Sequence, residues 1–127
     1  MFPEGGTVII FRCFNRIRGI ESSLIRLFMV SHPCETAGDL ARKLIQDGLA
    51  ACVHMLPAGE SIYSWKDEIC QEKETLLMIK TAADPKIFTE RVLEAHPYEC
   101  PEIIGFEVSE GHREYLDWIE QLSKGDS

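Results

Sequence analysis

The most constraining feature of this sequence is the order in which strand-like and helix-like patterns follow one another after residue 23. Short apolar runs of strand length alternate with segments whose apolar residues recur every three or four positions, as on one face of a helix. The order β-α-β-β-α-β, followed by a short C-terminal helix, predicts an α+β sandwich of the ferredoxin-like type, with helices on one face of an antiparallel sheet. The strand-like runs are 24–30, 50–56 continued by 61–66, 75–81 and 103–108, and the helix-like segments are 37–49, 84–95 and 112–122.

Residues that break or cap regular structure mark the ends of these elements. The segment 57–59 (Pro-Ala-Gly) interrupts the second strand, which predicts a long strand that is bent or bulged. Polar residues at 67–73 predict the turn of a hairpin, with 75–81 as its returning arm. Thr36 and Asp39 have the spacing of a capping pair before the first helix, and Asp84 followed by proline predicts the start of the second.

The regular pattern also sets the domain organisation. A chain of 127 residues, of which 45% are hydrophobic, fits one domain with its own core. We predict that residues 24–123 form this domain. Residues 1–23 mix apolar and basic residues unlike the rest, so we predict an N-terminal extension outside the core fold, and 124–127 form a short tail.

One strand predicts contact with other subunits. In the run 76–79 (Leu-Leu-Met-Ile), both alternating sets of side chains are hydrophobic. Strands of this kind are buried on both faces, whereas the helices of a ferredoxin-like domain cover only one face of the sheet. Partner subunits are the natural cover for the second face.

Net charge and cysteine usage limit the class of function. A chain with net charge −8 repels phosphate backbones and attracts cations, so we expect no nucleic acid as a partner, while the charge permits metal ions without requiring them. Five widely spaced cysteines without a CxxC pair predict neither a disulfide framework nor a structural zinc site, which favours a reducing compartment. No apolar run reaches about 20 residues and no secretory signal pattern is present, so we expect a cytoplasmic protein that does not span a membrane.

Several motifs, in order and in register through the predicted domain, resemble those of the CutA family of divalent-cation tolerance proteins. The resemblance covers roughly residues 24–122 and leaves out only the N-terminal extension. The motifs are Leu49-Ala50-Ala51-Cys52-Val53, Ser61-Ile62-Tyr63-Ser64-Trp65-Lys66, Leu77-Met78-Ile79-Lys80-Thr81, His96-Pro97-Tyr98-Glu99, Pro101-Glu102-Ile103 and Tyr115-Leu116-Asp117-Trp118.

This resemblance implies a tight homotrimer with a PII-like fold, in which the long hairpin forms much of the contact between neighbours. It also implies a role in the response to metal ions, with copper or another divalent metal ion bound. The alternative is a PII-like signalling or scaffold protein that binds a small ligand or a partner protein at clefts between subunits. Enzyme activity is least favoured, because the sequence has no G-x-S-x-G elbow, no P-loop and no G-x-G-x-x-G turn.

Six residues are candidates to line such a cleft between subunits. Tyr63 and Trp65 share one face of a strand, because strand side chains alternate, and the motif at 96–99 is expected to meet them there. Aromatic residues also favour subunit interfaces, so packing is an equally good explanation for both. The candidates are Tyr63, Trp65, Lys66, His96, Tyr98 and Glu99.

His96 and Met29 are the candidate metal ligands. His96 follows the end of a helix, and its neutral ring offers a nitrogen to a metal ion. Some copper-binding members of the family carry a cysteine near the end of the first strand and two adjacent histidines before Pro-Tyr, where this chain has Met29 and Ala95-His96. A thioether can bind Cu(I), although methionine in a strand is more often core filler and a lone histidine is more often structural.

Overall fold

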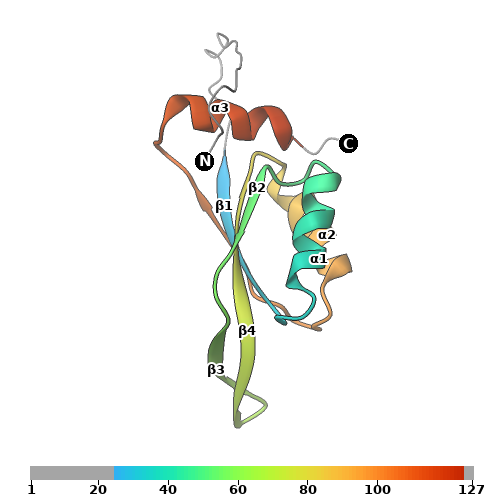
Figure 1. The fold of residues 1–127 in the computed structure, drawn as a ribbon. Coiled ribbons are helices and arrows are strands. Elements are labelled where there is room, and N and C mark those ends of the chain that lie inside the picture. Colours follow the sequence, from blue (N-terminus) through green and yellow to red (C-terminus); the bar gives the residue numbers. More distant parts are fainter. Residues whose placement is uncertain (1–24, 125–127) are drawn as a thin grey trace.

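The long strand β4 (Glu68–Thr81) is the centre of the sheet and pairs with β1, β2 and β3 (Figure 1). The computed structural model describes residues 25–124, in which the sheet has the order β2-β4-β1-β5 and every pairing is antiparallel. This arrangement confirms the predicted α+β ferredoxin-like fold with a short C-terminal helix. The extension predicted for 1–23 lies outside the described residues. The other elements are β1 (Arg26–His32), α1 (Ala37–Gln46), β2 (Cys52–Met55), β3 (Gly59–Trp65), α2 (Pro85–Ala95), β5 (Ile103–Glu107) and α3 (Arg113–Leu122).

The hairpin formed by β3 and β4 differs from the predicted one. The prediction of a polar turn over 67–73 is wrong, because the turn consists of Lys66 and Asp67 alone. Both residues have positive φ, 52° and 68°, as a tight turn that follows the twist of its strands requires. Residues 68–74 at the start of β4 are mostly polar although they form a strand, because this end of the hairpin projects beyond the helices into solvent (Figure 1). The predicted break in the preceding strand is present as the gap between β2 and β3.

The two helices of the sandwich begin differently. Asp84 caps α2 as predicted, since its Oδ1 accepts hydrogen bonds from two backbone amides of the first turn at 2.8 and 3.2 Å. The capping pair predicted for Thr36 and Asp39 is wrong. Thr36 stands at the N-cap of α1 but makes no capping bond with its side chain, and its hydroxyl lies 3.5 Å from Nδ1 of His32 instead.

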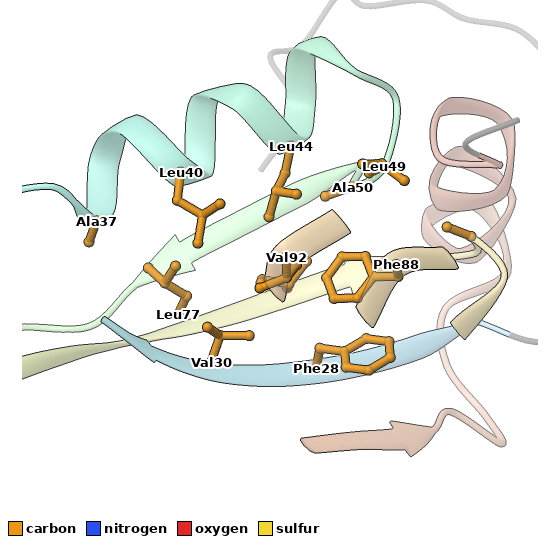
Figure 2. Close-up of a cluster of buried hydrophobic side chains, with 12 residues drawn as sticks. Phe28, Val30, Ala37, Leu40, Leu44, Leu49, Ala50, Leu77, Phe88 and Val92 are labelled. Carbon is orange, nitrogen blue, oxygen red and sulfur yellow. The ribbon is translucent and has the colours of Figure 1, made fainter. Parts of the chain in front are cut away.

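The main core lies between the sheet and the helices α1 and α2 (Figure 2). Side chains of α1 point toward the sheet, and the ring of Phe88 on α2 stacks on that of Phe28 on β1 at 4.3 Å between centroids. Each large side chain fully buried here contributes about 1.5–3 kcal/mol to folding. The buried cluster comprises Phe28, Val30, Ala37, Leu40, Leu44, Leu49, Ala50, Leu77, Ile79, Ala83, Phe88 and Val92.

The opposite face of the sheet is only partly covered in the described subunit. Helix α3 lies across the end of the sheet away from the hairpin, where Ile119 packs with Ile25 and Ala51 (Figure 1). The remaining apolar side chains that β1, β4 and β5 contribute to this face alternate with core residues. We call this set the open face: Leu27, Met29, Leu76, Met78, Ile104 and Phe106. In the described part of the chain, no helix has the length and apolar character needed to cross a membrane.

Candidate functional site

The end of α2 is joined to the sheet by the imidazole ring of His96. This residue follows the helix and is 8% exposed. Its Nε2 lies 2.7 Å from the carbonyl oxygen of Ser31 on β1, and its Nδ1 lies 3.1 Å from the backbone nitrogen of Tyr98. A carbonyl can only accept and a backbone amide can only donate, so Nε2 carries the hydrogen and Nδ1 is the acceptor. The two contacts therefore require the neutral ring in a single tautomer.

The same chain of contacts continues from Tyr98 to the base of the hairpin. The phenol of Tyr98 donates to Oε2 of Glu74 on β4 at 2.7 Å, and the hydroxyl of Ser61 on β3 donates to Oε1 at 2.7 Å. Glu74 is 7% exposed, so its carboxylate needs such partners. The result is a continuous path from β1 through the 96–98 segment to both strands of the hairpin. We call it the Ser31–Ser61 network.

The surroundings shift the pKa values of the titratable groups in this network. Burial lowers the pKa of His96, against the opposing effect of its hydrogen bond to Ser31. Burial and the hydrogen bond to Glu74 raise the pKa of Tyr98. Tyr98 therefore stays protonated as a donor through the neutral range, while His96 stays neutral as the network requires.

The predicted cleft residues fall into two groups within one subunit. The phenol of Tyr63 donates to Oε2 of Glu72 at 3.4 Å and lies close enough to Tyr98 to affect its pKa. Partial burial and the Glu72 carboxylate raise the pKa of Tyr63. Trp65 and Lys66, by contrast, lie at the tip of the hairpin.

The residues at the tip are exposed in the isolated subunit. Trp65 is 44% exposed, and Nζ of Lys66 stands 5.7 Å from the centroid of its ring, within the range of a cation–π contact. Glu99 lies on the exposed segment between α2 and β5. Within one subunit, His96, Tyr98 and Tyr63 lie close together at the base of the hairpin. Trp65 and Lys66 lie at its tip, away from these three residues.

The two predicted metal ligands do not meet within one subunit. Met29 alternates with the core residues Phe28 and Val30, so it belongs to the open face. His96 lies on the other side of the sheet, where its ring packs against that of His32 at 4.6 Å between centroids. Both ring nitrogens of His96 are already used in hydrogen bonds. Among residues 25–124, no group of three or more His, Cys, Asp or Glu side chains could hold a metal ion.

Sequence reasoning missed the residues that hold the network together. Glu74, Ser61 and Ser31 were not among the candidates, although Glu74 is the only charged residue between the predicted turn at 67–73 and the apolar run at 76–79. A carboxylate next to the apolar part of a strand is expected to be buried and to need hydrogen-bond donors. The wrong turn prediction hid that signal, because it placed the start of the strand after Glu74.

Comparison with known proteins places the chain in a family. The family model described as "CutA1 divalent ion tolerance protein" matches residues 26–122. The divalent-cation tolerance protein CutA of Thermus thermophilus is 45% identical over 89 residues, covering 68% of this chain and 85% of that protein. The human protein CutA is 35% identical over 106 residues, and the match spans 83% of this chain but only 59% of the human protein.

Solved structures give the same result. The structure of the divalent cation tolerance protein from Thermus thermophilus superposes with a TM-score of 0.73 at 38% identity, covering 78% of this chain and 98% of that one. A structure described as the PII-like protein CutA from Nostoc sp. PCC 7120, in apo form, gives a TM-score of 0.71 at 34% identity, covering 77% and 96%. Sequence motifs, strand order and these matches agree, and the chain belongs to the CutA1 divalent ion tolerance family.

Proposed function

We propose that this protein works as a cytoplasmic homotrimer in divalent-cation tolerance, and that it binds copper or another divalent metal ion at clefts between its subunits. The single observation that carries the proposal is the amount of apolar surface left uncovered by one subunit. On the open face, Ile104 and Phe106 are 45% and 50% exposed, beside four further apolar side chains. A contiguous patch of this kind marks an interaction surface.

The hairpin adds a second surface that needs cover. Ile62 and Ile69 are 66% and 83% exposed on one of its faces, while Tyr63 and Trp65 are more than 40% exposed on the other. A two-stranded ribbon that projects alone into water is at best marginally stable. Copies of the same chain are the proposed cover, and their number follows from the trimer that the family resemblance implies.

A trimer would also bring the two groups of candidate residues together. Trp65 and Lys66 at the hairpin tip lie away from the base of their own hairpin, but in the proposed trimer the tip of one subunit would lie against the body of the next. Such a cleft would contain residues from two subunits, with Glu99 at its rim. A metal ion would likewise need donors from more than one subunit, because the described part of one subunit gathers no adequate set.

The alternative function is PII-like signalling, in which the trimer presents a small-ligand cleft or a docking surface to a partner protein. One feature of the site favours it. The polar groups at the hairpin base are paired with one another, as in a fixed scaffold, rather than turned toward a shared metal position. Both candidates are binding functions, and neither requires catalysis.

The test combines light scattering with copper titration on the full chain. Wild type is expected to be a trimer at micromolar concentration with saturable copper binding. Phe106→Glu places a charge on the open face and should dissociate the trimer and abolish binding. Ile45→Glu is the matched control, since Ile45 is 43% exposed on α1, away from the open face, and should change neither property.

Each outcome separates the proposals. A stable wild-type monomer would contradict the trimer and its clefts. A trimer that does not bind copper would favour the signalling alternative. Copper binding that survives in monomeric Phe106→Glu would place the metal within one subunit, and comparison with Met29→Leu would then test Met29 as its ligand.

A further inference from the structure

We propose that Glu74 is a positioning residue, whose buried carboxylate sets the angle at which the hairpin of β3 and β4 leaves the sheet. Its side chain lies where the hairpin meets the body of the subunit, and the residue is 7% exposed. The angle is a property of one subunit. Its consequence for assembly rests on the proposed trimer, in which the hairpin carries contacts between subunits.

Glu74 stands at the junction between two kinds of strand pairing. Residues 75–81 of β4 pair with β1, whereas residues 68–74 pair with β3. At this junction β4 changes from an inner strand of the sheet to one arm of a two-stranded ribbon (Figure 1). Two-stranded ribbons twist more than wider sheets and are marginally stable alone. Pairing within the ribbon therefore does not fix the angle between the ribbon and the sheet.

The two carboxylate oxygens of Glu74 join the ribbon to the body. Oε2 accepts from the phenol of Tyr98, in the segment after α2, and Oε1 accepts from the hydroxyl of Ser61 on β3, both at 2.7 Å. Tyr98 is itself held to the body, because its backbone amide donates to the ring of His96, which is bonded to β1. One side chain on β4 therefore holds β3 with one oxygen and the body with the other.

A buried carboxylate is well suited to this task. It has two acceptor atoms, so it binds two separate donors at once, and hydrogen bonds to a charged acceptor are about twice as strong as those between neutral groups. Little water reaches Glu74, so a donor that leaves it is not readily replaced. Rotation of the ribbon away from Tyr98 breaks the bond to the phenol, and this cost restricts the hairpin to a narrow range of angles.

The length of the hairpin amplifies any change in this angle. Glu68, which pairs with Trp65 at the tip, precedes Glu74 by six positions, so the ribbon is about 20 Å long at about 3.3 Å per residue. A rotation of about 10° at the junction would move the tip by about 3–4 Å. Interfaces that form without rearrangement keep their backbones within about 1 Å. Tyr63 and Trp65 lie on the same face of the ribbon as Glu74, so the carboxylate also positions these candidate cleft residues.

The test measures residual dipolar couplings of backbone amides in the full chain, which report the orientation of the hairpin relative to the sheet. In wild type, one alignment tensor should fit residues 60–73 together with the body. Tyr98→Phe removes the phenol donor but keeps the ring, so residues 60–73 should no longer fit that tensor, while β1 and α1 still do. Gln71→Ala is the matched control, since it removes a hydrogen bond to Glu60 within the ribbon and should leave the orientation unchanged.

Light scattering over a dilution series tests the consequence for assembly. Tyr98→Phe should raise the concentration at which the trimer dissociates by about tenfold, because a hairpin without a fixed angle must be ordered on association. Couplings that fit equally well in wild type and Tyr98→Phe would overturn the positioning role, and so would equal disturbance of hairpin and body. A changed orientation with unchanged dissociation would overturn the consequence for assembly. A monomeric wild type would contradict the proposed trimer, whereas the couplings would still test the role of Glu74.

Discussion

Substitution of Gly105 by alanine tests how tightly the edge strand β5 is packed on the core. Gly105 pairs directly with Phe28 in the register of β1 and β5. A Cβ at this position would stand 2.7 Å from Cε1 and 2.9 Å from Cζ of the Phe28 ring. That ring is 4% exposed and is stacked on the fully buried Phe88, so it has no space into which to move. We expect Gly105→Ala to lower the free energy of unfolding by about 1–3 kcal/mol, the usual cost of overpacking.

Urea denaturation at one fixed protomer concentration measures this difference, because any assembly of subunits makes stability depend on concentration. Gly59→Ala is the matched control. It is also in a strand, but its added Cβ meets nothing within 4 Å, so the change should stay within about 0.5 kcal/mol. In the double variant with Phe28→Leu, the clash should be relieved, giving a favourable coupling of about 1 kcal/mol. An unchanged stability in Gly105→Ala would refute the packing argument.

Two further predictions concern local backbone geometry and are measured by thermal unfolding at fixed protomer concentration. Asp84→Ala should cost about 1 kcal/mol because it removes the two capping bonds of α2, whereas Thr36→Ala should cost much less, since Thr36 makes no side-chain capping bond. Equal losses would contradict this assignment of the caps. Asp67→Gly should raise stability by about 0.5–1 kcal/mol, because the φ of 68° strains any residue with a side chain. A loss of stability there would mean that the Asp67 side chain makes a contact that outweighs the strain.

The fold could be predicted well because its signals are local. β1, the inner half of β4 and β5 each carry an apolar run, and Asp84 with its following proline marks the start of α2 through ordinary capping chemistry. Strand order then follows from the alternation of strands and helices. The first part of β4, residues 68–73, escaped prediction because both of its faces are largely exposed in one subunit. Without a buried face there is no alternation of apolar and polar residues to read.

The candidate site was harder to predict because its contacts join residues far apart in the chain. His96 and Ser31 are separated by 65 positions, and Tyr98 and Glu74 by 24. The sequence identifies His96 and Tyr98 as unusual residues after a helix end. It does not show that Ser31 and Glu74 are their hydrogen-bond partners, because those contacts depend on how the 96–98 segment lies against β1 and β4.

The spacing of His96, Pro97 and Tyr98 has a physical cause that the network reveals. A residue before proline avoids the helical conformation, and His96 is extended accordingly, with φ −93° and ψ 139°. The chain therefore leaves α2 at this residue and turns so that the amide of Tyr98 comes back to the ring of His96, two positions earlier. A histidine that served only as a metal ligand would not need a hydrogen bond from the amide of Tyr98 to its own ring. The motif at 96–98 was predicted to bind a metal ion. Within one subunit, its contacts are explained by a structural role, since they hold the base of the hairpin. Any metal that His96 binds must compete with the amide of Tyr98 or the carbonyl of Ser31 for a ring nitrogen.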